Sequence, residues 1–163
     1  MRKNADFFNS VKNAAKGIVE AFLNETNMRI HFAFANLIMI FAYFYGISRE
    51  QWAILMIMIG LVFFAELMNT AIENAVDTAT RKKCETARRA KDIAAGAVLI
   101  IALISVVTGF LIFYNPPKIL STLTYIFTTP KALIPSVAVG IADIFIVVFL
   151  KRKRTDSFER NVE

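Results

Sequence analysis

The chain has 163 residues, of which 56% are hydrophobic and 15 are phenylalanine. A chain of this length could fold as one soluble domain, but this apolar content indicates an integral membrane protein. The formal net charge is +6. Lysines and arginines cluster beside the apolar blocks without any nucleic-acid motif, so we expect a basic surface facing the membrane and no nucleic-acid partner.

Residues 6–24 predict an amphipathic helix. Apolar side chains recur there with a helical period over a wide face, and Asn, Lys and Glu lie between them. We expect this helix to lie in the membrane surface. The alternative is a soluble helix packed on a protein core, for which the rest of the chain offers little material. Arg2 and Lys3 are followed by this amphipathic stretch, which lacks an apolar run and a small-residue cleavage site, so we predict no cleaved signal peptide.

Two apolar blocks then predict an antiparallel pair of membrane spans. The polar segment 25–31 is predicted to be a hinge, and the first span to cover residues 30–45. The turn at residues 46–51 is so short that the second span, which begins near Trp52, must return antiparallel. No second His or Cys lies near His31, so we expect it at the membrane interface rather than in a metal site.

Two more spans are expected toward the C-terminus. The third covers residues 90–114 and ends at Asn115-Pro-Pro-Lys, because proline interrupts a helix. Residues 121–135 are predicted to be a loop or an interfacial piece. Residues 134–150 form a fourth, shorter apolar stretch that contains Asp143.

The basic residues indicate the topology. They concentrate in segment 81–91 and in the tail that begins Lys151-Arg-Lys-Arg, whereas the loops holding Arg49 and Lys118 carry few. The rich segments belong in the cytoplasm, so both chain ends are expected there, with four crossings between them. The tail either fixes this topology or holds anionic lipid. Cys84 is the sole cysteine, and we predict a free thiol.

The second span runs into a stripe of polar residues. Glu66, Asn69, Glu73 and Asp77 fall within roughly 80° on one helix face. Glu66 would lie about 9 Å inside the cytoplasmic boundary of the membrane. An ionisable group there costs several kcal/mol unless it is paired or wet, which favours a function. The alternative is a structural seam that hydrogen-bonds neighbouring helices.

This stripe suits phosphate chemistry. Its carboxylates, with Lys91 and Asp92 and the basic loop at the same end, could bind Mg²⁺ held on the phosphates of a nucleotide. A carboxylate buried in the membrane could also act as a base for a hydroxyl that arrives from the lipid side. The chain has no glycine-rich phosphate loop, so a nucleotide site would have to be built from side chains on helices.

Two motifs carry a family resemblance. The segments Glu66-Leu-Met-Asn-Thr-Ala-Ile-Glu-x-x-Val-Asp77 and Ala90-Lys-Asp-x-Ala-Ala-Gly-Ala-Val-Leu resemble the signature of the bacterial integral-membrane diacylglycerol kinases, which include undecaprenol kinases. The pairs Lys16-Gly17 and Asn24-Glu25, together with Arg29, fit the N-terminal part of this family.

The resemblance implies an all-α membrane protein with an N-terminal amphipathic surface helix and a three-helix core. It also implies a homotrimer in the bacterial plasma membrane that uses ATP at the cytoplasmic interface. The likeness covers roughly residues 5–114. We therefore expect a kinase-like membrane domain at residues 1–114, followed at 115–163 by a loop, an extra fourth transmembrane helix and a basic cytoplasmic tail.

The resemblance also implies roles for individual residues. Glu66 would be the catalytic base on the lipid hydroxyl, while Glu25 and Glu73 would hold Mg²⁺. The residues expected to bind the nucleotide or its phosphates are Lys16, Gly17, Asn69, Asp77, Lys91 and Asp92.

Two features depart from the family pattern. Asp143 lies in the extra span and has no family role, so we expect a helix-packing or water-facing acid. Asp6 and Asn9 stand where some relatives carry basic residues, and this affects the nucleotide-side contacts expected of the N-terminus.

The leading hypothesis is a kinase that phosphorylates a membrane lipid alcohol, either undecaprenol or diacylglycerol, and so feeds phospholipid synthesis or recycling of an envelope lipid carrier. The segment Asn-Met-Arg-Ile-His after Glu25 is more similar to Gram-positive members, which favours undecaprenol. The alternatives are a proton-relay or transporter-like protein and a non-catalytic scaffold. A relay would not need a Lys-Asp pair beside a basic loop, and internal repeats are not visible.

Overall fold

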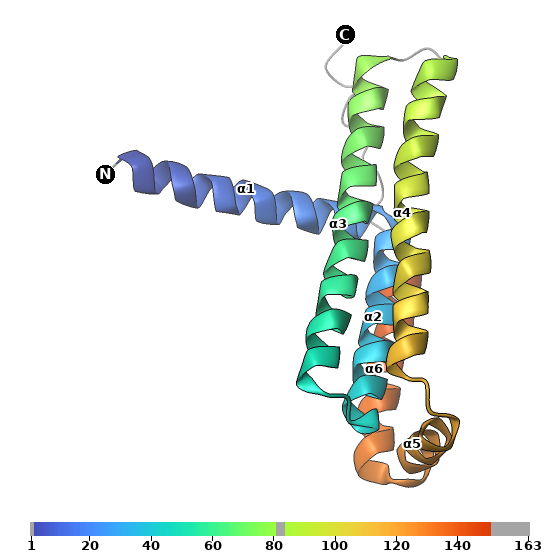
Figure 1. Ribbon diagram of the computed structural model, residues 1–163. Helices are drawn as coiled ribbons and strands as arrows, with labels where there is room; N and C mark the ends of the chain where they lie inside the picture. Colours follow the sequence, from blue (N-terminus) through green and yellow to red (C-terminus); the bar gives the residue numbers. More distant parts are fainter. Residues whose placement is uncertain (1, 81–83, 151–163) are drawn as a thin grey trace.

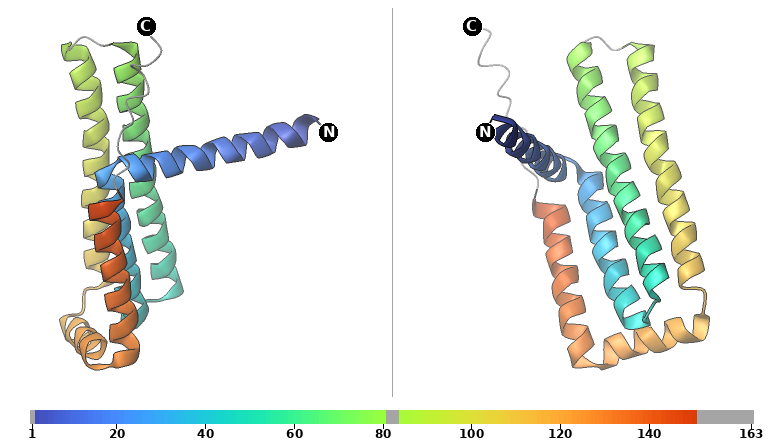
Figure 2. Two further views of the ribbon diagram at one scale, coloured as in Figure 1. Left: turned by 180° about the vertical axis from the view of Figure 1, so that it is seen from behind. Right: turned by 60° about the vertical axis from the view of Figure 1, so that its left-hand side comes forward.

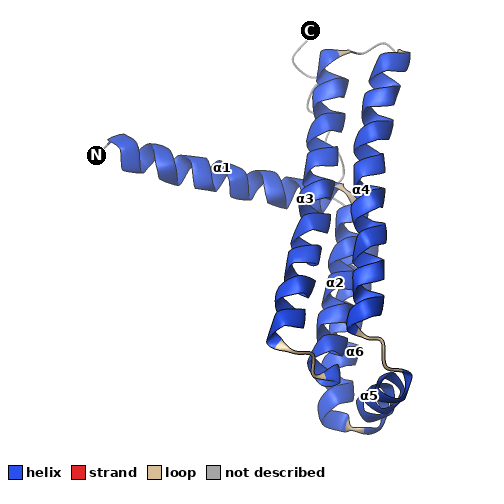
Figure 3. Ribbon diagram, in the orientation of Figure 1, coloured by secondary structure: helices blue, strands red, loops and turns tan. Residues whose placement is uncertain are grey.

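The computed structural model describes residues 2–80 and 84–150, with side chains from Phe7 onward. Within these ranges every regular element is a helix (Figure 3). Four of the helices are long and apolar enough to cross a membrane, which confirms the predicted all-α membrane protein. The helices are α1 (Arg2–Asn24), α2 (Thr26–Tyr45), α3 (Arg49–Ala79), α4 (Glu85–Ile112), α5 (Pro116–Thr128) and α6 (Pro130–Phe149), and the four membrane-crossing ones are α2, α3, α4 and α6.

The four membrane-crossing helices stand side by side in the order α4, α3, α2, α6 (Figure 2). Helix α4 packs along α3, α6 packs along α2, and the contact between α2 and α3 joins the two pairs. Helices α3 and α4 extend past the start of α2 toward the segment that connects them (Figure 1). The acid stripe on α3 therefore continues beyond the part of the bundle that α2 covers.

Helix α1 leaves the bundle at a steep angle and projects to one side (Figure 1). Its described residues from Phe7 to Glu20 are all exposed, and the apolar side chains of Phe7 and Phe8 are 67% and 73% exposed. Such an apolar face without a protein partner fits a helix that lies on a membrane surface.

The predicted hinge at residues 25–31 is wrong in its extent, because only Glu25 lies between α1 and α2. Arg29 belongs to α2 and is 1% exposed. Its guanidinium donates hydrogen bonds to the carbonyl oxygens of Phe22 (3.2 Å) and Leu23 (2.8 Å). These carbonyls are in the last turn of α1 and lack intrahelical partners. Arg29 thus ties the end of α1 to the start of α2 and fixes the angle between them.

The turn between α2 and α3 confirms the predicted antiparallel return. Gly46 ends α2 with a φ of 68°, a left-handed conformation that glycine adopts without a Cβ penalty. Ser48 then starts α3 with a capping box, in which the backbone N–H of Ser48 donates to the side chain of Gln51 at 2.8 Å, and the backbone N–H of Gln51 donates to the Ser48 hydroxyl at 3.3 Å.

Residues 121–135, which were predicted to be a loop or an interfacial piece, are helical in α5 and at the start of α6, with only Thr129 between these helices. The side chain of Asn115 caps α5 by accepting a hydrogen bond from the backbone N–H of Lys118 at 3.1 Å, and the two prolines occupy its first turn. Proline ends a helix from within but favours the first turn of a new one. Helix α5 lies across the end of the bundle and leads into α6 (Figure 2).

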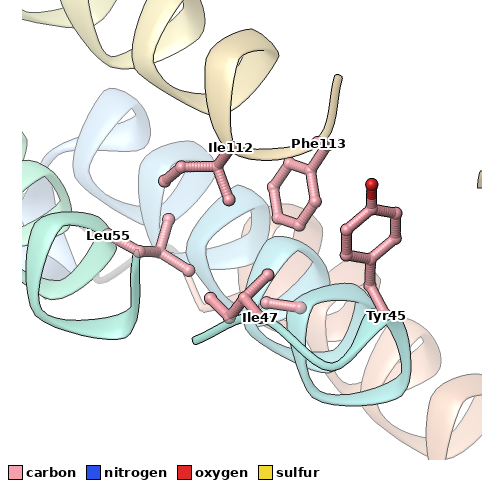
Figure 4. Close-up of a cluster of buried hydrophobic side chains, with 6 residues drawn as sticks. Tyr45, Ile47, Leu55, Ile112 and Phe113 are labelled. Atoms are coloured by element: carbon pink, nitrogen blue, oxygen red, sulfur yellow. The ribbon is translucent and has the colours of Figure 1, made fainter. Parts of the chain in front are cut away.

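Apolar side chains close this end of the bundle. The cluster joins α2, α3, the end of α4 and the turn between α2 and α3 (Figure 4). Its buried members are Ala42, Tyr45, Ile47, Leu55, Ile112 and Phe113. At the opposite end of the bundle, the described part of the α3–α4 pair carries charged side chains that form ion pairs.

The added helix α6 is fixed to α2 by a polar contact between spans. The amide Nδ2 of Asn36 donates a hydrogen bond of 2.8 Å to Oδ1 of Asp143, which is 4% exposed. The structure thus places Asp143 as a helix-packing acid. The basic residues of segment 81–83 and the tail from Lys151 onward lie outside the described residues.

Candidate active site

Glu66 is a buried carboxylate between two spans. It lies on α3 and is 3% exposed. Its Oε1 lies 3.1 Å from Nε2 of His31, which α2 contributes. The imidazole is half-buried, with 26% of its side chain exposed. His31 therefore satisfies one oxygen of the buried acid, a contact that the sequence analysis did not anticipate.

Two more carboxylates lie near Glu66. Glu25, from the junction of α1 and α2, and Glu73, two turns further along α3, are both close enough to interact electrostatically with it. Asn69 lies between Glu66 and Glu73 along α3, and its Nδ2 donates a hydrogen bond to Oε1 of Glu73 at 3.0 Å. The Oδ1 atom of Asn69 is buried without a partner among the described residues. The structure thus brings four predicted site residues together.

Further along the stripe, an ion pair joins α3 to α4. Nζ of Lys91 lies 2.5 Å from Oδ1 of Asp77. Asp92, the neighbour of Lys91 in sequence, instead pairs with Arg88 on its own helix at 2.9 Å. The two predicted nucleotide-binding residues of α4 therefore have different partners, and only Lys91 is joined to the acid stripe.

Lys16 and Gly17 are placed differently. Both lie on the exposed part of α1, and a Cβ at Gly17 would meet nothing within 4 Å. The structure does not bring them to the acid stripe within one protomer. Asn9 is likewise exposed on α1, whereas the side chain of Asp6 lies outside the described residues.

An apolar cavity of about 460 Å³ lies among α2, α3 and α4. His31 contributes to its wall, so the cavity reaches the contact with Glu66. Leu55 and Phe113, members of the apolar cluster of Figure 4, also line it. Leu55 precedes Glu66 by eleven residues, which is roughly 16 Å along a helix. The cavity therefore offers hydrocarbon-lined space that leads to a buried carboxylate.

Metal geometry is not complete in one protomer. Among the described residues, no group of three or more His, Cys, Asp or Glu side chains is arranged to hold a metal ion. Glu25 and Glu73 nevertheless provide two carboxylates within electrostatic range of Glu66. Mg²⁺ commonly takes one or two protein carboxylates and completes its shell with water and phosphate oxygens. This donor set fits a metal that is held mainly by a nucleotide.

Comparison with known proteins gives the family. Residues 12–113 match the family model described as prokaryotic diacylglycerol kinase. The chain is 43% identical over 107 residues to the undecaprenol kinase of Bacillus subtilis, covering 66% of this chain and 87% of that protein. It is 34% identical over 122 residues to a diacylglycerol kinase of Synechocystis sp., covering 71% and 70%.

A diacylglycerol kinase of Escherichia coli K12 is 29% identical over 119 residues, covering 71% of this chain and 98% of that protein. No solved structure matches the chain significantly. The family match includes both motifs on α3 and α4 and stops before α5 and α6. The chain thus belongs to the prokaryotic diacylglycerol kinase family and is a membrane-embedded lipid kinase.

Proposed function

We propose that this kinase transfers the γ-phosphate of ATP to the hydroxyl of a membrane lipid alcohol, with Glu66 as the general base. The observation that carries the proposal is the position of Glu66, which is 3% exposed, bonded to His31, and next to the end of an apolar cavity. A lipid alcohol whose hydrocarbon chain occupied this cavity would have its hydroxyl near the depth of Glu66.

In the proposed reaction, the lipid oxygen attacks the γ-phosphorus and the bond from that phosphorus to the β,γ-bridging oxygen of ATP breaks. Glu66 accepts the hydroxyl proton as the new phosphorus–oxygen bond forms, and ADP leaves. Such transfers depend mainly on positioning and on stabilisation of charge. The protein must therefore align the acceptor and hold the phosphates.

The rest of the stripe is proposed to hold the phosphates. Glu25 and Glu73 would bind Mg²⁺, which supplies charge neutralisation for the phosphate oxygens. Lys91 would add positive charge that balances the phosphates. Its Nζ already lies beside the stripe, 2.5 Å from Oδ1 of Asp77. The other proposed nucleotide contacts are Asn69, whose buried Oδ1 atom has no partner in the described ranges, Asp92, Lys16 and Gly17.

A homotrimer is proposed for two reasons. The exposed apolar side chains on α3 and α4, such as Ile57 and Val106, fit contacts with lipid or with other copies. Lys16 and Gly17 also lie away from the stripe of their own protomer, so a neighbouring copy could bring α1 to a shared site. We further propose that both termini are cytoplasmic and that residues 1–114 form the catalytic domain.

The proposed substrate is undecaprenol, with diacylglycerol as the second candidate. The match at 43% identity is to a protein named undecaprenol kinase, whereas the matches at 34% and 29% are to proteins named diacylglycerol kinase. Both lipids present a hydroxyl at the membrane interface, so the choice rests on sequence similarity rather than on the geometry of the cavity.

The test is transfer of labelled γ-phosphate from ATP to undecaprenol and to diacylglycerol in matched bicelles, with wild-type protein and Glu66→Gln. We expect the wild type to phosphorylate undecaprenol faster, and Glu66→Gln to lose transfer to both lipids. If folded wild-type protein phosphorylates neither lipid, the proposal fails. The acid stripe would then have to be explained as a proton relay or as a scaffold seam.

A further inference from the structure

His31 holds the buried acid from a different helix. Of the groups near Glu66, Glu25 and Glu73 carry the same charge, and within the described part of the chain His31 is the one side chain in hydrogen-bonding range of the carboxylate. The Nε2 atom must carry the proton to donate to an ionised carboxylate, whichever protonation state the other nitrogen has. His31 is therefore the donor that offsets burial of Glu66.

The direction in which His31 points from α2 depends on how this helix is rotated about its axis. Arg29, two residues earlier, is 1% exposed and bonds to two carbonyl oxygens in the last turn of α1 and to the hydroxyl of Thr26 at 3.1 Å. These contacts set the rotation of α2 about its axis where it begins. Because His31 is only half a turn from Arg29, its imidazole is held toward α3 by the same contacts.

The bond leaves the carboxylate half occupied. His31 engages Oε1 of Glu66, and Oε2 remains for a second partner. Since the imidazole also lines the apolar cavity, the held carboxylate lies where a lipid hydroxyl would emerge from it. Without this contact, the Glu66 side chain would populate several rotamers. Misplacement of a reacting group by about 1 Å can lower the rate about 100-fold.

We propose that His31 is a positioning residue for phosphoryl transfer, whose Nε2–H holds one oxygen of Glu66 so that the other faces the lipid hydroxyl. This inference rests on the proposed role of Glu66 as the base. His31 acts through Glu66 and need not touch the lipid or the nucleotide. Its loss should therefore lower kcat and leave the KM for both substrates nearly unchanged.

The experiment compares His31→Leu, His31→Gln and His31→Asn in bicelles containing the lipid that the wild type phosphorylates. A glutamine amide reaches the position of Nε2, whereas an asparagine amide ends one carbon short. We expect kcat to fall about 10- to 100-fold in His31→Leu and in His31→Asn, and to stay within about threefold of wild type in His31→Gln. Both KM values should change less than about twofold.

Asp143→Ala is the matched control, because it removes a second polar contact that α2 makes with a neighbouring span. It should keep the wild-type kcat. Thermal unfolding and size-exclusion chromatography of each variant separate a folding defect from a positioning defect. His31→Leu with wild-type kcat would overturn the inference, as would a kcat that follows the unfolding temperature in all variants, including His31→Gln and Asp143→Ala.

Glu66→Gln separates this inference from the proposed function. If Glu66→Gln is as active as wild type, the base assignment fails and the inference fails with it. If Glu66→Gln is inactive and His31→Leu is fully active, only the inference fails. Loss in both variants with recovery in His31→Gln supports both.

Discussion

Within the part of the chain that the structure describes, two buried acids lie in the membrane-crossing helices, and they differ in their surroundings. Glu66 on α3 is 3% exposed and Asp143 on α6 is 4% exposed. Each contacts one side chain of α2, since His31 holds Glu66 and Asn36 holds Asp143. The two partners are five residues apart, which places them about 140° from each other around α2. Helix α2 thus contacts α3 of the family core through His31 and the added helix α6 through Asn36.

The two acids differ in the charged groups and the space around them. Glu66 has Glu25 and Glu73 within electrostatic range and a cavity that His31 lines. Asp143 has the hydrogen bond from Asn36, while its Oδ2 is buried without a partner among the described residues. We propose that burial of a carboxyl group in a membrane does not by itself mark a reactive site. In this proposal, the neighbouring charges and the adjacent cavity distinguish Glu66 as the reactive acid.

Metal removal should separate the two regions most strongly. Chelation with EDTA is expected to abolish lipid phosphorylation, and added Mg²⁺ to restore it, because the proposed carboxylates hold the metal together with nucleotide phosphates. Glu73→Gln should raise the Mg²⁺ concentration needed for half-maximal activity by about tenfold or more, since removal of a charged ligand weakens the site. Asp143→Asn should leave this requirement unchanged, and equal Mg²⁺ titrations for both variants would contradict the placement of the metal.

The charged end of the α3–α4 pair gives the next largest effect. Lys91→Met should raise the KM for ATP about tenfold, equivalent to about 1.4 kcal/mol, because a charge-assisted contact to phosphate is lost. Lys118→Met is a matched control at the opposite end of the bundle, where the Lys118 ammonium lies 4.2 Å from the ring centroid of Tyr45. Steady-state kinetics with varied ATP measure both. A similar KM in the two variants would place the nucleotide elsewhere.

The smallest effect on activity is expected from the added helix. Asp143→Ala leaves the Asn36 amide without its partner and should lower the free energy of unfolding by about 1 kcal/mol, in keeping with polar contacts between membrane helices. The kcat should stay within about twofold of wild type. Equilibrium unfolding in mixed micelles and an activity assay on the same preparation test this. A kcat lowered tenfold or more at full folding would make Asp143 part of the reaction.

Much of the fold followed from hydrophobic pattern and turn chemistry. The four spans, the short return at Gly46 and the acid stripe were all predicted, because each depends on residues close in sequence. The stripe even pairs internally as its spacing suggests, since Asn69 bonds to Glu73. Helix α5 was missed because Pro116 and Pro117 were interpreted only as a stop, although proline also suits the first turn of a new helix.

The contacts between helices could not be predicted in the same way. The bond between His31 and Glu66 depends on how α2 is rotated, and this rotation depends on Arg29 bonding to carbonyl oxygens of α1. The polar residues around Arg29 looked like a hinge because the sequence did not show that the arginine would be buried and satisfied. The partner of Asp143 was hidden for the same reason, since Asn36 is 107 residues away in sequence.

The most direct measurement compares initial rates of lipid phosphorylation by Glu66→Gln and Asp143→Asn in the same bicelles at saturating MgATP. Both variants replace a buried carboxyl group with an isosteric amide, so the comparison isolates the position of the acid. We predict that Glu66→Gln loses about 100-fold or more of kcat, as expected for removal of a general base, and that Asp143→Asn keeps the wild-type rate. Comparable rates in the two folded variants would contradict the assignment of Glu66 as the reactive acid.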